Sequence, residues 1–374
     1  MIDIIMDPNN YPFWIIVVSV IALAIAVIAR PFSSYIKFVY PNAKYETIGN
    51  PYIQEKNLSS LVDTPNLDSF IEKLNSSKDY EIKGVTTKEI QQSFDENFRR
   101  TLDMMKKDSS KKMHKFFDAY LEKNDFYLIK KELKNKFVND NVSNKSIEKT
   151  IFRENKKLLS KIMDAEKKDL PDILKNYGFS NEIIKEFSNE ELDYLALDST
   201  IDKSYLEKLI NVKVPYKCDK AKNEFIKRFI DINNIKNVLR AKQMGYEKEK
   251  INKLFLSEGR EIAKWKFEEL ADADSISQAI SSLEGTSYYN ELKDSIEKYN
   301  KEQSVQIFEN ALDRVYLKHI KNISQNNFVT IGPTIRFLVS KEFEIRNLKI
   351  ISKGIAEGLG SELIKELIIR EASI

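Results

Sequence analysis

The sequence predicts an all-α protein, and three observations point to this fold: few turn residues, apolar residues at helical spacing, and a threefold internal repeat. Only 10 glycines and 9 prolines occur in 374 residues, and between Pro65 and Pro333 only Pro171 and Pro215 interrupt the chain. A sheet protein of this size needs more residues that favour turns. We therefore expect roughly 60–70% helix, well above the base rate of about a third.

Charge and cysteine content exclude several classes of protein. Lys and Arg number 60 against 57 Asp and Glu, a net charge of +3. This near balance argues against a nucleic-acid partner, because phosphate contacts need a local excess of basic residues. Cys218 is the single cysteine, which excludes an internal disulfide and a thiolate cluster and fits a reducing compartment. With two histidines, His114 and His319, we predict no metal and no cofactor.

The first predicted element is a single transmembrane helix at residues 11–29, an apolar run of 19 residues without charge. As a helix it spans about 28 Å, close to the ~30 Å hydrocarbon core of a bilayer. Tyr11 and Trp14 lie at one end, where amphipathic rings favour the membrane interface.

Charges that flank the run predict its orientation. Acidic residues precede it and basic residues follow it: Asp3, Asp7, then Arg30, Lys37 and Lys44. The positive-inside rule therefore makes residues 1–10 a short extracytoplasmic tail and places the bulk of the chain on the cytoplasmic side of the cell membrane.

Two other interpretations of the run remain open. Ala24 and Ala26 resemble a signal-peptide cleavage site, although the segment before the run is acidic where a signal peptide is basic. A buried core helix is the second alternative, but such a helix rarely has Ser19 as its one polar residue. We favour the membrane anchor.

After the anchor, related segments recur three times. Apolar–Lys pairs end at Lys130, Lys236 and Lys349, at intervals of 106 and 113 residues. The last two pairs begin 33 and 35 residues after the aspartate of an acidic segment, and residues 94–102 are a fainter copy of that segment. The matched positions are Asp198 with Glu309, Ile201 with Leu312, Asp202 with Asp313, Tyr205 with Tyr316, and, later, Asn234 with Asn347.

Each copy has apolar residues at three- and four-residue intervals, as at Phe225, Phe229, Ile232 and Leu239, which predicts amphipathic helices around a core. We expect three similar helical bundles at residues 30–140, 141–246 and 247–374, related by a pseudo-threefold axis. Alternatively, the first helices after the anchor pack against the last domain.

The sequence lacks the common catalytic motifs. It contains no Gly-Lys dipeptide for a P-loop, no His-Glu-x-x-His and no Gly-x-Ser-x-Gly. Gly354, Gly358 and Gly360 have the wrong spacing for a dinucleotide fingerprint and are expected at helix ends. The i,i+4 pairs Asp198/Asp202 and Glu309/Asp313 could form an acid–base site, but we favour solvated helix faces. We predict no catalytic residue.

Basic residues occupy two repeated positions. Lys130, Lys236 and Lys349 hold the first, and Lys134, Arg240 and Lys353 hold the second, four residues later. One interpretation is an ordinary solvated helix face. The other is a recurrent basic rim that contacts acidic surfaces of partner proteins.

Five segments together resemble the C subunits of archaeal A-type ATP synthases, a family related to the d subunits of eukaryotic V-type ATPases. They are NNIKNVLRAKQMG (233–245), LEGTSYYNEL (283–292), FENALDRVYL (308–317), KEFEIRNLKIISKG (341–354) and YPNAKYETIGNPYI (40–53). The resemblance covers residues 40–374, with Lys44 in place of the family's Arg.

The resemblance implies three helical domains in a funnel that acts as a non-catalytic socket of the central stalk. As part of the rotor, such a socket couples the membrane rotor (proteolipid) ring of a proton- or sodium-translocating ATP synthase to the subunits of its central shaft. The anchor departs from the usual pattern of the family, and we expect residues 11–29 to contact lipid or to lie in the lumen of the ring. A membrane-anchored helical adaptor without a rotary role is the alternative.

Overall fold

The computed structural model describes residues 11–49, 53, 55–77, 79–138, 152–179, 181–187 and 192–370. This part of the chain is 77% helical and contains no strand, which confirms the all-α prediction and exceeds the expected helix content. The extracytoplasmic tail expected at residues 1–10 lies outside the described residues.

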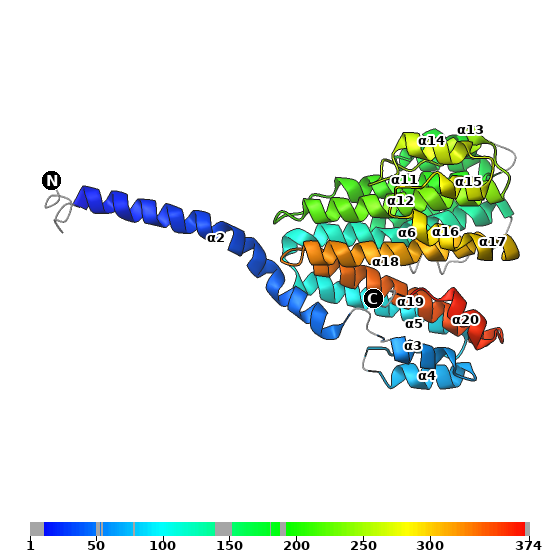
Figure 1. The fold of residues 1–374 in the computed structure, drawn as a ribbon, viewed down its shortest axis with the longest axis horizontal. Coiled ribbons are helices and arrows are strands. Elements are labelled where there is room, and N and C mark those ends of the chain that lie inside the picture. The colour runs from blue at the N-terminus through cyan, green and yellow to red at the C-terminus, as the bar shows by residue number, and fades with distance from the viewer. Residues whose placement is uncertain are drawn as a thin grey trace.

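Helix α2 (Tyr11–Ile48) carries the predicted membrane anchor and extends away from the rest of the molecule (Figure 1). Residues 11–29 have a mean hydropathy of 2.8, and none of that apolar window is buried within the chain. The interpretation as a buried core helix is therefore wrong. The other end of α2 enters the body, where Tyr45 is buried and stacks on Phe337 with 4.5 Å between ring centroids.

Within the described residues, six long helices form the body. Each helix contacts the next in chain order, and the last contacts the first, so they close into a six-helix ring. The helices come in three pairs: α5 (Thr87–Asp108) and α6 (His114–Val138), α11 (Tyr194–Asn211) and α12 (Asp219–Gln243), α18 (Gln306–Asn326) and α19 (Gly332–Ala356). The ring agrees with the predicted repeat, and the exact threefold relation stays a prediction.

Local sequence explains where α5 begins. Thr86 accepts a hydrogen bond from the backbone N–H of Glu89, and the Glu89 carboxylate accepts one from the backbone N–H of Thr86 at 3.1 Å. This reciprocal capping box satisfies two donors that a helix start leaves unpaired. Gly84 has φ +92° just before the cap, a conformation that glycine adopts without strain.

Short helices cover the outside of the ring. α8 (Arg153–Asp164) packs on α6 and leads to α9 (Leu170–Asn176) and α10 (Asn181–Glu186). The second group packs on α12 and α18: α13 (Lys248–Asn252), α14 (Lys264–Asp272), α15 (Ile276–Ser281), α16 (Tyr289–Asp294) and α17 (Ile296–Glu302).

The third group joins the two ends of the body. α3 (Glu55–Val62) and α4 (Leu67–Asn75) pack on α19, and α3 also contacts α20 (Ser361–Leu367). The first helices after the anchor therefore pack against the last copy, as the alternative expectation had it. The domain limits at 140 and 246 stay predictions.

The three turns within the helix pairs meet at one end of the ring, which we call the turn end (residues 109–113, 212–218 and 327–331). Ser110 Oγ and Tyr216 OH, from two of these turns, are 2.9 Å apart. The third turn is held by α2, since Asn42 Nδ2 donates to the carbonyl oxygens of Phe328 and Thr330 at 2.8 and 3.0 Å.

The glycine cluster near the C-terminus follows the expectation in part. Gly358 has φ +69° two residues after the end of α19, and Gly360 directly precedes α20, so both lie at helix ends. Gly354 lies within α19, and the prediction was wrong there. A Cβ on Gly354 would come within 2.7 Å of Ile364 Cγ1, so this glycine lets α20 approach α19 closely.

Candidate functional site

The first repeated basic position lies at the junctions between helix pairs. Lys130 Nζ on α6 is 2.5 Å from Asp202 Oδ1 on α11, and Lys236 Nζ on α12 is 2.6 Å from Asp313 Oδ1 on α18. Lys349 on α19 pairs with Asp95 on α5. Three equivalent lysines therefore form ion pairs that join each helix pair to the next and return to the first.

The second repeated basic position adds a second ion pair at two of these junctions. Lys134 Nζ is 2.7 Å from Asp198 Oδ2, and Arg240 binds both carboxylate oxygens of Glu309 at 2.6 Å. At the third junction Gln91 stands where the first two have an acid, and Lys353 lies 3.8 Å from Glu357, the residue that follows its own helix. All six basic residues therefore have a carboxylate nearby within this chain, and contact with a partner protein stays a prediction.

These pairs correct the expectation for the acidic residues. Glu309 and Asp313 are only 7% and 4% exposed, so the interpretation as a solvated helix face is wrong for them. They are buried because each neutralises a basic side chain of the preceding helix pair. Burying a charge is unfavourable, as Lys236 shows: burial lowers the pKa of its ammonium group even though Asp313 opposes this shift.

Sequence reasoning missed a second set of repeated acids, Asp125, Asp231 and Glu344, each five residues before a repeated lysine and buried. Each carboxylate accepts one or two hydrogen bonds from backbone N–H groups of a segment outside its own helix. The donors are Phe152 to Asp125, Glu261 and Ile262 to Asp231, and Ile53 to Glu344, at 2.7–3.0 Å. The constant offset from the lysines is the signal that could have identified them.

The matched asparagines make the same contacts in their two copies. Asn234 donates to Ser257 O and accepts from Leu256 N–H at 3.0 and 2.9 Å. Asn347 donates to and accepts from the backbone of Ile369 at 2.6 and 2.9 Å. Each side chain thus satisfies a chain segment that has no regular secondary structure to pair with.

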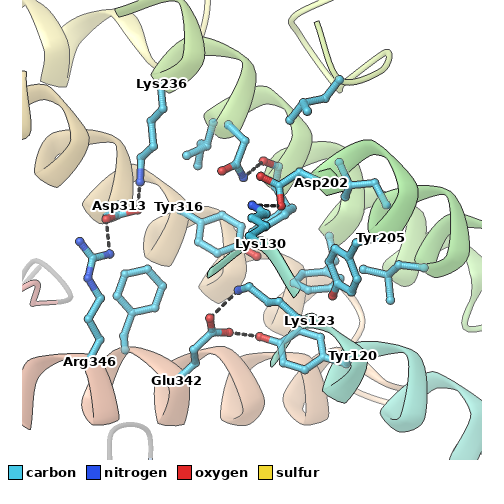
Figure 2. A pocket seen from close by; sticks show the side chains of 18 residues that line it. Tyr120, Lys123, Lys130, Asp202, Tyr205, Lys236, Asp313, Tyr316, Glu342 and Arg346 are labelled. Atoms are coloured by element: carbon cyan, nitrogen blue, oxygen red, sulfur yellow. Dashed lines mark hydrogen bonds and ion pairs between the residues drawn. The ribbon is translucent and has the colours of Figure 1, made fainter. Parts of the chain in front are cut away.

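A cavity of about 270 Å³ lies inside the six-helix ring, lined by residues of α6, α11, α12, α18 and α19. We call it the axial cavity. Three lining residues hold one repeated position, seven before the lysines, and differ in chemistry: Lys123, Phe229 and Glu342. Lys123 Nζ is 2.5 Å from Glu342 Oε1 (Figure 2). The same nitrogen is 5.1 Å from the centroid of the Phe229 ring. A cation, an aromatic ring and an anion from matched positions of the three copies therefore meet inside the cavity.

The axial cavity also exposes tyrosines at matched positions. Tyr205 on α11 and Tyr316 on α18 line it together with Tyr120, which donates to Glu342 (Figure 2). Burial raises the pKa of all three well above the ordinary value, so they remain protonated donors at neutral pH.

Burial also shifts the pKa of two other titratable groups, Cys218 and His319. Cys218 is buried, and burial raises the pKa of its thiol to about 12, so the nucleophilic thiolate is scarce at neutral pH. Burial, reinforced by Arg228, lowers the pKa of His319 to about 4. Among the described residues no cluster of three or more His, Cys, Asp or Glu side chains could hold a metal ion.

The described residues thus form an all-α protein in which repeated charges join three related helix pairs. Residues 41–367 match the family described as ATP synthase (C/AC39) subunit, and the chain belongs to this family. It is a non-catalytic subunit of a rotary ATP synthase complex.

Relatives support this assignment along the chain. The C subunit of the A-type ATP synthase of Methanosphaera stadtmanae is 28% identical over 364 residues, which cover 95% of this chain and 94% of the relative. The Methanobrevibacter smithii protein of the same name is 28% identical over 369 residues, with the same coverage. That of Methanocaldococcus jannaschii is 36% identical over 203 residues, 54% of this chain and 48% of the relative.

Proposed function

We propose that this chain is a central-stalk rotor subunit of a proton- or sodium-translocating A-type ATP synthase, a socket that couples the membrane rotor ring to the central shaft. The observation that carries the proposal is the closed six-helix ring with an ion pair at every junction. Torque passes through such a body without loss only if its helices do not slide. The junction ion pairs oppose sliding, most strongly at Lys236–Asp313, because separating a buried pair is costly.

The contacts of α2 support a position of the anchor near the axis of rotation. Phe38 packs on Tyr216 with 6.1 Å between ring centroids, Lys44 Nζ is 2.7 Å from Asp108 at the end of α5, and Asn42 holds the third turn. Because α2 contacts all three helix pairs at the turn end, it leaves the body where the pairs converge. A helix at this place turns with the rotor without sweeping through lipid.

We therefore place residues 11–29 in the lumen of the rotor ring, with the turn end facing the membrane and the bulk of the chain in the cytoplasm. The charge asymmetry around the apolar run supports this orientation, since basic residues follow it.

Among the six repeated basic residues, Lys353 is the best candidate for a partner contact. Its side chain is 64% exposed, and its ion-pair partner, Glu357, is 3.8 Å away and directly follows the same helix, so little holds it in this chain. Lys301 is the matched control, because it is similarly exposed and pairs with Glu297 four residues away on α17.

Copurification tests the proposal. The tagged full chain is expected to bring down ring and shaft subunits at one copy of itself per complex, and Lys353→Glu is expected to weaken this recovery more than Lys301→Glu. A membrane-anchored adaptor, the alternative function, would recover neither ring nor shaft at fixed stoichiometry. That result would overturn the rotor role.

A further inference from the structure

The axial cavity has unused hydrogen-bond donors. The hydroxyls of Tyr205 and Tyr316 line it, and within the described chain neither makes a hydrogen bond. Both side chains are more than nine-tenths buried, at 3% and 6% exposure. Each hydroxyl is therefore free to donate a hydrogen bond to a molecule or ion inside the cavity.

The carboxylates of the cavity do not supply that acceptor. Asp313 accepts from both Lys236 and Arg346, and Glu342 accepts from both Lys123 and Tyr120. Each ammonium has three donors, of which its carboxylate partner uses one. Donors therefore exceed free acceptors.

The cavity also has more basic than acidic side chains. Four basic side chains face three acidic ones: Lys123, Lys130, Lys236 and Arg346 against Asp202, Asp313 and Glu342. The lining therefore carries one more positive than negative charge, and an added anion would balance it.

We propose that the axial cavity binds one small oxyanion, with the hydroxyls of Tyr205 and Tyr316 as its neutral donors and the neighbouring ammonium groups as its counter-charge. The volume of about 270 Å³ admits an ion of phosphate size together with several waters, at ~30 Å³ per water. Either a tetrahedral phosphate or a planar carboxylate has the required acceptors. This inference stands on the cavity alone and does not rest on the rotor role.

Calorimetric titration of the detergent-solubilised full chain with inorganic phosphate, and separately with acetate, tests the site. We expect saturable binding of one ion per chain for at least one of the two, and the stronger ligand identifies the preferred shape. The double variant Tyr205→Phe/Tyr316→Phe keeps the rings and all charges and is expected to weaken binding about tenfold or more, because two donors to a charged ligand are lost.

Tyr127→Phe is the matched control. Tyr127 lies on α6 like Lys123 but is 66% exposed and outside the cavity, so its removal is expected to leave the affinity unchanged. The single variants Tyr205→Phe and Tyr316→Phe keep the test decisive if the double variant does not fold. The proposal fails if neither ion binds saturably, or if the tyrosine variants bind as the unchanged protein does, which would leave only water in the cavity or an ion at another place.

Discussion

At the scale of single residues, Asp313 makes two ion pairs at once. It accepts from Lys236 Nζ at 2.6 Å and from Arg346 Nη1 at 2.5 Å, and it is 4% exposed. We expect Asp313→Asn to lower the free energy of unfolding by about 3 kcal/mol or more, because a buried lysine loses its counter-charge. Urea unfolding monitored by circular dichroism measures the change.

Glu297→Gln is the control for this substitution. Glu297 pairs with Lys301 at 2.7 Å, but the two side chains are 83% and 72% exposed, so water screens them. The expected loss is below about 0.5 kcal/mol. If the two substitutions lower the unfolding free energy equally, the buried ion pairs of Asp313 do not stabilise the fold more than an exposed pair does.

His319 gives stability a pH dependence of known sign. Burial, with help from Arg228 and Lys318 and against Glu261, holds its pKa at about 4, below the ordinary 6.5. Between these values the unfolded chain binds a proton that the folded chain does not, so stability falls as the pH is lowered from 6.5 to 4. His319→Gln keeps a polar group near Ser287 Oγ, which His319 Nε2 contacts at 2.9 Å, but cannot titrate.

The measurement is the unfolding free energy of both proteins across that range. The curve of the variant is expected to be shallower than that of the unchanged chain, while carboxylates titrate equally in both. Parallel curves would show that His319 is protonated alike in the folded and unfolded states.

The sequence predicted the repeated residues but not their partners. Lys130, Lys236 and Lys349 stood out because their spacing is regular, and Asp202 and Asp313 because they repeat. Pairing a lysine with an acid 72 or 77 residues later requires knowing which helix lies beside which. A one-dimensional pattern does not contain that information, so the acids were expected to be solvated.

At the scale of secondary-structure elements, α2 combines two environments in one helix. Its first half is apolar and exposed, while Phe38 and Tyr45 in its second half are buried in the body. Removal of residues 1–29 is expected to release the protein from liposomes, measured by flotation, without loss of the folded body. Each deleted apolar residue contributed to transfer into the bilayer.

A longer deletion is the comparison. Removal of residues 1–47 also takes away Phe38 and Tyr45, and each buried aromatic contributes about 3–5 kcal/mol when truncated. This variant is expected to unfold at a clearly lower temperature than the shorter one. If both unfold alike, α2 serves only as an anchor.

The elements themselves were predictable in type, and their grouping was less so. Helical spacing of residues such as Phe225 and Phe229 identified α12, because a buried stripe leaves a period in the sequence. The packing of α3 and α4 on α19 joins segments about 290 residues apart, as in the bond of 2.7 Å from Ile53 N–H to Glu344. A local sequence pattern cannot show which distant segments pack together. The packing of the first helices on the last copy was therefore only an alternative expectation.

At the scale of the whole molecule, the three junctions are not equal. The Lys236–Asp313 pair is almost fully buried, whereas Lys349 and Asp95 are 33% and 56% exposed and lack the second pair found at the other junctions. Double-mutant cycles on unfolding free energy are expected to give a coupling of about 1–3 kcal/mol for Lys236–Asp313 and below about 1 kcal/mol for Lys349–Asp95. Equal coupling energies would show that burial does not determine how strongly an ion pair stabilises a junction of the six-helix ring.

The position of the anchor in the assembled complex can be tested with one cysteine. Ile21→Cys places a thiol midway along the apolar run, where the side chain is 53% exposed, and the native Cys218 gives little background because its thiol is buried with a pKa of about 12. A helix in the lumen of the rotor ring touches only ring subunits. A bifunctional cross-linker on this thiol is therefore expected to join the chain to ring subunits and never to a stationary membrane protein of the complex. Cross-links to stationary subunits would place the helix outside the ring, where a rotating body could not carry it past the stator, and the rotor assignment would then have to be abandoned together with the axial anchor.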